Sequence, residues 1–195
     1  MGEHQPPATH YRLGNTAGGF YAEFLTPLIG GNEDRRGRSA ATVRIAGVTS
    51  QKLRYLELLL NSPWGVMLDR AKGFPVAQHT AVQVPNASSY LAQKVLIHAK
   101  RERREQSKNF MYIHDTIQTF GPSLERLRYE WESNVKPRLH SKAAAIVARG
   151  AEVLFREVTD VTREAAIEAR ATGRSISAEE IQAVCYAGLQ QVFAQ

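Results

Sequence analysis

His114 is followed directly by Asp115, and this adjacent pair is the part of the sequence with the clearest capacity for acid–base chemistry. A histidine positioned beside a carboxylate can act as a general base, and His98 and His140 supply further imidazoles. None of these residues is accompanied by a nucleophile elbow, a phosphate-binding glycine loop or His and Cys at metal-ligand spacing. We therefore expect no catalytic residue, no metal site and no cofactor, and we expect that the chain is not an enzyme.

Cys185 is the only cysteine of the sequence and lies among Ala183, Val184 and Tyr186. A single thiol forms neither a disulfide nor a cysteine zinc site within one chain. The apolar neighbours instead predict a buried thiol that packs as a small hydrophobic side chain.

Composition indicates a globular protein with a basic surface. The 195 residues suffice for one ordinary domain or two small ones, and 43% of them are hydrophobic and 23% charged. The sequence contains no apolar run of membrane-spanning length, and residues 1–4 lack the pattern of a signal peptide, so a soluble intracellular protein is expected. The net charge of +6 favours a polyanionic partner. Its basic excess lies before residue 131, since acidic and basic residues balance after it.

The first two thirds of the chain are expected to form a tail followed by short helices. Residues 1–40 are rich in Gly, Pro, Asn and Thr and predict a flexible tail. Helical spacing of apolar residues predicts helices over 53–60 and 64–72. Asn86 is a predicted N-cap for a helix that becomes strongly charged from Lys100 to Lys108. Further along we expect an apolar connector at 110–113, a helical turn at 114–120 and a helix at 124–135 that Ser123 caps and Pro137 ends.

The clearest segment is 141–172, which has no proline and only one glycine and predicts a single very long helix. Its apolar residues alternate steps of four and three and form a narrow seam, which a second helix must cover. The predicted dimerisation residues on this seam are Val147, Leu154, Val158, Val161 and Ala165. Gly173 is a suitable C-terminal stop, and Ser177 with Glu180 predicts a capping box that opens a last helix over 178–193.

This order of a medium helix, a very long helix and a medium helix resembles the histone fold. Residues 142–184 are most similar to core histone two-B: Ser141-Lys142-Ala143 opens the long helix, Leu154-Phe155-Arg156-Glu157 lies within it, and Arg174-Ser175-Ile176-Ser177 precedes Glu180-Ile181-Gln182. The resemblance implies an all-α fold with a histone fold at 122–195. In this expected fold the extra carboxy-terminal helix of histone two-B has no counterpart, because the chain stops at Gln195.

Residues 41–121 resemble a second, degenerate histone fold, similar to histone three. The similarity rests on Thr42-Val43, Glu57-Leu58-Leu59 and Pro63-Trp64, and on the length of 79–118. Pro85 falls inside the expected long helix, and Asn109 and Met111 replace the usual loop arginine and threonine. The resemblance implies two histone folds in tandem that form an intramolecular handshake pair, as in viral histone doublets.

The resemblance further implies a nuclear DNA-packaging protein that holds duplex DNA by its phosphates and assembles with other histone-fold proteins, without a membrane or a small-molecule substrate. The DNA contacts expected on this basis, or from their basic clusters, are Arg138, Ser141, Lys142, Arg174, Ser175, Arg104, Lys108, Arg35, Arg36 and Arg38. Arg174 also admits a role as a solvated loop charge or a partner of Glu180. One alternative function is a histone-fold subunit of a transcription or chromatin complex, and another is a helical plasmid or phage scaffold.

Overall fold

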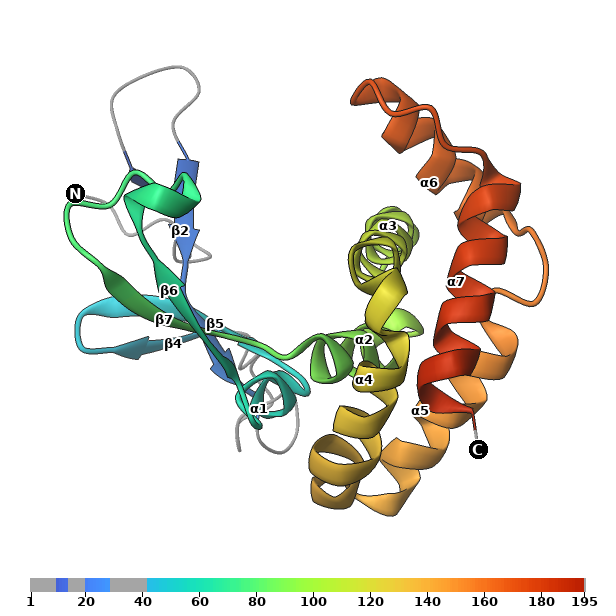
Figure 1. The fold of residues 1–195 in the computed structure, drawn as a ribbon, viewed down its shortest axis with the longest axis horizontal. Coiled ribbons are helices and arrows are strands. Elements are labelled where there is room, and N and C mark those ends of the chain that lie inside the picture. The colour runs from blue at the N-terminus through green and yellow to red at the C-terminus, as the bar shows by residue number, and fades with distance from the viewer. Residues whose placement is uncertain (1–9, 14–19, 29–41, 195) are drawn as a thin grey trace. The chain divides into compact units, whose positions relative to one another are not determined.

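The computed structural model describes residues 10–13, 20–28 and 42–194, and the chain divides into two compact units, residues 1–57 and 58–195 (Figure 1). The described part of the first unit consists mainly of strands: β1 (His10–Leu13), β2 (Phe20–Glu23), β3 (Leu25–Pro27), β4 (Thr42–Ile45) and β5 (Val48–Leu53). The second unit contains a β-hairpin followed by a bundle of helices. The short helix α1 (Leu56–Leu59) spans the boundary between the units.

The strands of the first unit form two small sheets. β1 pairs with β2 antiparallel, and β5 lies between β3, which is parallel to it, and β4, which is antiparallel. The β4–β5 turn is tight because Ala46 and Gly47 both adopt positive φ angles, 49° and 82°, as a two-residue hairpin turn of this type requires. The Tyr11 hydroxyl accepts a hydrogen bond from the Thr49 amide at 2.7 Å, which joins the two sheets.

The hairpin of the second unit consists of β6 (Trp64–Leu68) and β7 (Thr80–Val84), which pair antiparallel. The helices that follow are α2 (Ala87–His98), α3 (Arg103–Phe120), α4 (Leu124–Glu130), α5 (Ser141–Val153), α6 (Asp160–Ala171) and α7 (Ala178–Phe193). A π-helical turn, Trp131–Val135, prolongs α4. None of the described helices is both long and apolar enough to cross a membrane.

Asn86 begins α2 as predicted and also fixes the segment before the hairpin. Its side-chain oxygen accepts a hydrogen bond from the Ser89 amide at 2.7 Å. Its side-chain nitrogen donates to the carbonyl oxygens of Asn61 and Ser62, each at 3.0 Å. Because Asn86 is fully buried, these bonds satisfy polar groups that water cannot reach.

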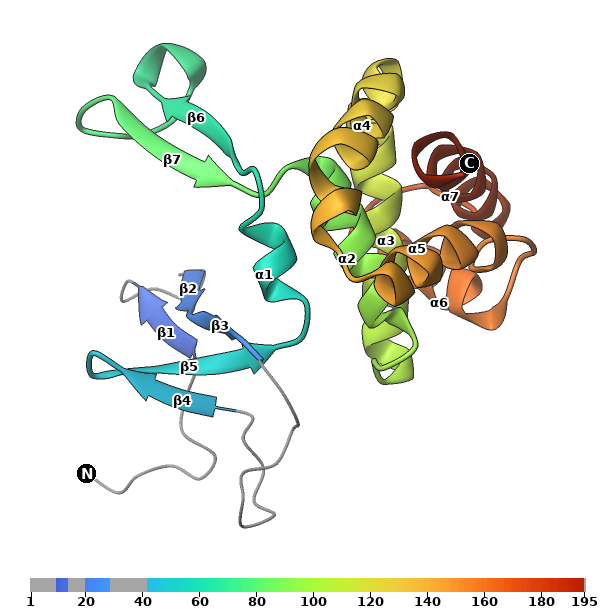
Figure 2. The ribbon, with the colours of Figure 1, turned by 90° about the horizontal axis from the view of Figure 1, so that it is seen from below.

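The helical core is built around α7, which packs against α3, α4, α5 and α6 (Figures 1 and 2). Aromatic side chains fill it: the rings of Trp131 and Phe193 meet edge to face with centroids 4.8 Å apart, and those of Phe110 and Phe155 are 4.1 Å apart. All four are at most 2% exposed. This aromatic core is therefore covered within one chain, whereas Ile146, Val153 and Ile167 at the surface of the bundle are exposed.

The predicted very long helix over 141–172 is wrong, because the chain turns between α5 and α6. Thr159 caps α6, since its hydroxyl accepts from the Thr162 amide while the Thr162 hydroxyl accepts from the Thr159 amide at 2.7 Å. In the linker, Phe155 is fully buried and its carbonyl accepts from Gln182 Nε2 at 2.6 Å. Burial of Phe155 and capping at Thr159 favour the break over continuation of the helix.

Consequently the expected dimerisation seam is not one continuous stripe. Val147 lies on α5, Leu154 and Val158 in the linker, and Val161 and Ala165 on α6. Val147 and Ala165 are fully buried within the chain's own core. Packing inside the second unit thus supplies the cover that the sequence led us to expect from a crossing helix.

Two more local predictions are wrong, and a third, the helix at 53–60, holds only for the four residues of α1. The segments 53–60 and 64–72, expected as helices, contain the end of β5, the four-residue α1 and β6. In β6 exposure alternates from residue to residue, because the strand pairs with β7 and shows each face in turn. The expected connector 110–113 lies inside α3, where Phe110, Ile113 and Ile117 are buried at helical spacing.

Other predictions are confirmed. Ser177 caps α7 by accepting a hydrogen bond from the Glu180 amide at 3.0 Å, and Gly173 follows α6 with a φ of 82°. An all-α histone fold is nevertheless wrong, because the described residues contain three small sheets and no long central helix. Neither 41–121 nor 122–195 forms the expected histone fold.

Candidate phosphate-binding site

The strongest concentration of charge in the helical unit lies where α2 ends and α3 begins. Residues 94–108 carry six Lys or Arg and two Glu. The cluster forms because a short loop after His98 reverses the chain, so that basic residues near the end of α2 face those at the start of α3. Such a surface attracts anions.

Lys94, Arg101 and Lys108 gather around Glu105, and we name these three residues the cation cluster. Arg101 Nη1 lies 3.7 Å from one Glu105 oxygen, and Lys108 Nζ lies 3.1 Å from the other. Arg101 and Glu105 also dominate the charged surroundings of Lys94. One carboxylate therefore balances part of a threefold positive charge, and the remainder is available to an anionic ligand.

Lys94 is the most constrained member of the cation cluster. Its ammonium nitrogen lies 4.7 Å from the centre of the Tyr90 ring and 4.9 Å from that of Tyr112, within the range of cation–π attraction. Burial and, to a smaller extent, the neighbouring charge of Arg101 lower the pKa of Lys94 to about 8, against the opposing effect of Glu105. An anion beside Lys94 would favour the charged form of this lysine, so this position is suited to binding one.

Tyr90 shares this environment. Burial, followed by Tyr112 and Asp115, raises the pKa of its hydroxyl to about 12. The phenol is therefore neutral at physiological pH and adds no negative charge to the site.

A groove of about 200 Å³ adjoins the cation cluster: it shares Lys108 with the cluster and is also lined by Tyr112, whose ring contacts Lys94. The groove runs between α3, α6 and the segment after α6, and its lining is completed by Met111, Asp115, Glu168, Ala169, Thr172 and Arg174. Its wall thus carries cations, carboxylates and an aromatic ring, a mixture suited to a polar ligand.

Asp115 and Arg174 form a two-pronged ion pair on the groove wall. Arg174 donates from Nη1 and Nη2 to the two carboxylate oxygens at 2.9 and 2.5 Å. The hydrogen bonds from Arg174 lower the pKa of Asp115, with burial opposing them and His114 adding to them. The pair ties the loop after α6 to α3, so Arg174 has Asp115 as its partner and not Glu180.

Replacing Arg174 with methionine should lower the free energy of unfolding at pH 7 by about 1 kcal/mol, a value appropriate for a half-exposed pair with two parallel hydrogen bonds. Because the folded-state pKa of Asp115 lies below its ordinary value, the pair stabilises the fold above about pH 4 and loses this effect as the pH falls. Urea unfolding at pH 7 and at pH 3.5 measures the difference. Arg170→Met, at an exposed position on α6, is the control; equal stability of both variants at pH 7 would contradict the prediction.

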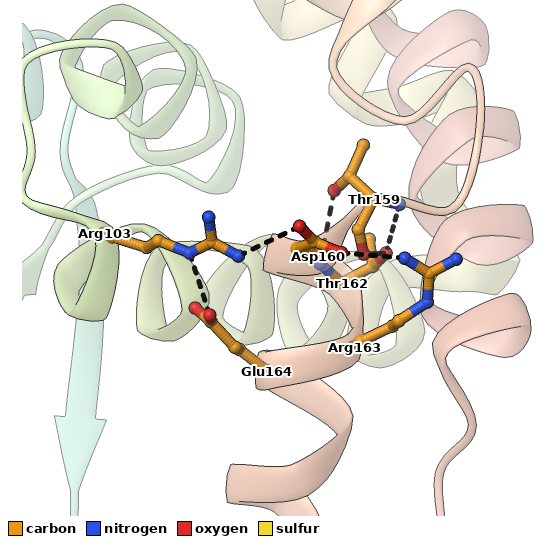
Figure 3. Close-up of polar contacts among 6 residues, drawn as sticks. All are labelled: Arg103, Thr159, Asp160, Thr162, Arg163 and Glu164. Atoms are coloured by element: carbon orange, nitrogen blue, oxygen red, sulfur yellow. Dashed lines mark hydrogen bonds and ion pairs between the residues drawn. The ribbon is translucent and has the colours of Figure 1, made fainter.

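A second set of ion pairs joins α3 to α6 at the other side of the basic segment (Figure 3). Arg103 Nε donates to Glu164 at 2.8 Å, and its Nη2 lies 3.5 Å from Asp160. Asp160 also accepts from Arg163 at 2.9 Å. Arg103 therefore has two carboxylates of α6 for one cation, whereas Arg101 and Lys108 share the single carboxylate of Glu105.

Of the three imidazoles considered from the sequence, those of His98 and His114 are buried, whereas His140 is exposed and caps the start of α5. His114, which was expected near a helix start, lies in the middle of α3; it is 2% exposed, and its Nδ1 is 3.1 Å from Asp115 Oδ1. His98 is 9% exposed and stacks on Phe110 with centroids 4.6 Å apart. Cys185 is buried as expected, and burial raises the pKa of its thiol. These buried groups are part of the packed core, so we assign them no role in acid–base chemistry.

The structure distributes the predicted DNA contacts over several elements. Lys108 and Arg174 line one groove, whereas Arg138 donates to Ser62 Oγ at 2.7 Å. The remaining described contacts are exposed: Arg104 on α3, Ser141 and Lys142 at the start of α5, and Ser175 before α7. Arg35, Arg36 and Arg38 lie outside the described residues. A duplex DNA partner and a nuclear location stay predictions.

Sequence reasoning missed Lys94, Arg101, Tyr90 and Tyr112. One feature of the sequence could have identified Lys94 as a candidate: it is the only charged residue in the segment 87–97. Lysine is seldom buried unless its charge has a partner, so a lysine in a largely apolar helix indicates such a partner. The approach of Arg101 and Tyr112 depends on how α2 packs against α3 and has no such signal.

Comparison with known proteins adds a family assignment. The sequence profile of a family described as Nucleotidyltransferase matches residues 1–136, which is more than half of the chain. The match includes both the strands of the first unit and the whole cation cluster. No curated protein and no solved structure matches the chain.

This match corrects the conclusions drawn from the histone resemblance. The histone doublet, the DNA-packaging function and the alternative of a histone-fold subunit in a chromatin complex are wrong, because the profile that fits these residues belongs to another family. The expectation that the chain is not an enzyme is also corrected, since the family is named for an enzymatic activity. The chain belongs to the nucleotidyltransferase family.

Proposed function

We propose that this chain binds a nucleoside triphosphate through its cation cluster and transfers the nucleotidyl group to an acceptor. The observation that carries the proposal is that Arg101 and Lys108 pair with one carboxylate, that of Glu105, which also acts on the charge of Lys94; the three cations come from α2, the loop after it and α3. Membership of the nucleotidyltransferase family supports it, because the matched residues contain all three cations.

The geometry suits a polyphosphate for electrostatic reasons. Lys94 is partly buried, and charge interactions are stronger where water is excluded. Arg101 and Lys108 are held by Glu105 at distances from which they can exchange the carboxylate for phosphate oxygens. Because the cations are already grouped before the ligand binds, they need little rearrangement when negative charge develops on the ligand during the reaction.

In the proposed reaction a nucleophilic oxygen of the acceptor attacks the α-phosphorus and loses its proton to water. The bond from the α-phosphorus to the bridging oxygen breaks, and pyrophosphate leaves with the electron pair. The cation cluster stabilises the negative charge that develops on this leaving group, the principal way in which proteins accelerate phosphoryl transfer.

Reactions of this class commonly use divalent cations held by carboxylates and substrate phosphates. Among the described residues, no three His, Cys, Asp or Glu side chains lie close enough to hold a metal ion. The described side chains therefore do not fit such a centre by themselves, and we derive no step through it.

The proposal changes two expectations drawn from the sequence, one about the ligand and one about Lys108. A small-molecule substrate was not expected from the sequence, and it is now the proposed ligand. Lys108, predicted as a contact to DNA phosphates, is proposed to bind the phosphates of a nucleotide.

Replacing both Arg101 and Lys108 with alanine should weaken the binding of ATP to the full chain by at least about 100-fold, because the two charge-assisted hydrogen bonds together contribute at least about 3 kcal/mol. Isothermal titration calorimetry with ATP and with inorganic triphosphate measures the loss. Pyrophosphate release from the four ribonucleoside triphosphates with Mg²⁺ should fall in parallel.

Arg149→Ala is the matched control, because Arg149 is an exposed arginine of the same unit and its ion pair with Glu152 is long, at 4.0 Å. It should bind ATP like the natural chain. Unchanged affinity in the Arg101→Ala, Lys108→Ala double variant, or an equal loss in the control, would refute the proposed site.

A further inference from the structure

We infer that the groove beside the cation cluster binds the ribose of the bound nucleotide and selects ribonucleotides over 2′-deoxyribonucleotides. The inference rests on the proposed function, because it places the phosphates of the same ligand on the cation cluster. It adds a sugar specificity and assigns that specificity to α6.

The first argument is the continuity between groove and cluster. Lys108 and Tyr112 line the groove, and each also takes part in the cluster, Lys108 as a member and Tyr112 as a ring against Lys94. A ligand whose phosphates contact Lys108 therefore has its next atoms at the mouth of the groove. In a nucleoside triphosphate those atoms belong to the ribose.

The second argument is the presence of unsatisfied acceptors on the groove wall. Asp115 and Glu168 line the groove, and ionised carboxylates only accept hydrogen bonds. The vicinal hydroxyls of ribose are donors that proteins commonly recognise with a carboxylate. Asp115 is largely satisfied by Arg174. Glu168 makes no hydrogen bond or ion pair to any described residue, so it has the free acceptors.

The third argument is the aromatic wall. Tyr112 is 49% exposed although its ring lines the groove. An exposed ring beside a polyphosphate site offers a stacking surface that tolerates different bases. Selection by the sugar is therefore expected to be stronger than selection by the base.

Glu168 and the rest of α6 lie outside residues 1–136, the part that matches the family profile. The helix is held on α3 by Arg103, through Asp160 and Glu164, and by the Asp115–Arg174 pair. Sugar selection is thus assigned to a segment that packs onto the matched part of the chain and completes the groove.

The test compares ATP, 2′-deoxy-ATP and inorganic triphosphate by calorimetry on the full chain. ATP should bind about tenfold more tightly than 2′-deoxy-ATP, which corresponds to one hydrogen bond to a charged acceptor. In Glu168→Gln the preference should fall to about twofold or less, while the affinity for inorganic triphosphate stays unchanged. Glu152→Gln, at an exposed position on α5, should keep the full preference.

The outcomes separate this inference from the proposed function. If the chain binds none of the three ligands, the proposed function fails. If it binds inorganic triphosphate but does not distinguish ATP from 2′-deoxy-ATP, the proposed function survives and the ribose assignment is overturned. The comparison on the natural chain decides this even if Glu168→Gln folds poorly.

Discussion

Replacing Gly188 with alanine is expected to lower the free energy of unfolding by about 2 kcal/mol, within the range for inserting a methyl group into a packed core. A Cβ atom at this position would lie 2.4 Å from Ile117 Cγ2 and 2.8 Å from its Cδ1. Ile117 is 4% exposed and lies where α3 packs against α7, so its side chain has little room to move. Overpacking therefore outweighs the gain of about 1 kcal/mol in helix propensity.

Urea unfolding followed by circular dichroism measures this change. Ala187→Gly, at the exposed neighbouring position of the same helix, calibrates the propensity effect. Combining Gly188→Ala with Ile117→Ala should make room for the new methyl group and give a favourable coupling energy between the two sites. A Gly188→Ala variant more stable than the natural chain would show that α7 does not pack on Ile117 as described.

Replacing Lys94 with methionine should weaken the binding of inorganic triphosphate at pH 7 by about 10- to 100-fold, the effect of one charged hydrogen bond. Because the pKa of Lys94 is about 8 in the free protein, the natural chain should also lose affinity as the pH rises through this value. Lys94→Arg keeps its charge over this range, so its affinity should depend much less on pH. Calorimetry from pH 7 to pH 9.5 distinguishes the three proteins.

The free energy of unfolding should rise with pH, whereas the affinity for triphosphate should fall. The pKa of Lys94 is lower in the folded chain than its value of about 10.4 in an unfolded chain, so the unfolded state holds more protons between these values and the stability rises with pH there. Lys94→Met lacks this rise and should be at least as stable as the natural chain at pH 7. A variant that unfolds at pH 7 or keeps its triphosphate affinity would contradict the assignment.

Most local signals in the sequence predicted local structure correctly, although Ser123, predicted to cap α4, makes no capping hydrogen bond. Asn86 and Ser177 cap α2 and α7, and Gly173 follows α6 with a positive φ. Each of these predictions depends on interactions within a few residues. Backbone groups at helix ends need partners, and short polar side chains supply them in almost any tertiary context.

Predictions that depended on periodicity alone were less reliable. Apolar spacing suggested one helix through 141–172, and the same spacing is met by two helices joined at a buried Phe155 and a capped Thr159. Spacing also suggested a helix at 64–72, where pairing with β7 produces a strand. Periodicity reports which side chains are buried and does not report what covers them.

The histone resemblance failed for a related reason. It rested on the order and the apparent lengths of three helices and on short identities distributed along them. Such an order recurs in unrelated folds, because any amphipathic helix buries its apolar face against whatever element is near. The family match covers residues 1–136, a range that contains the basic segment and all the described strands, which the histone resemblance did not predict.

The sequence by itself determined the helix caps, the burial of Cys185 and the accumulation of basic residues between α2 and α3, since these depend on neighbours along the chain. Only the tertiary structure decided which of the basic residues act together. Arg174 reaches Asp115 across 59 positions, and Lys94 meets Tyr112 because α2 packs on α3. Contacts of this kind depend on the geometry of helix packing, which the pattern of single residues does not specify.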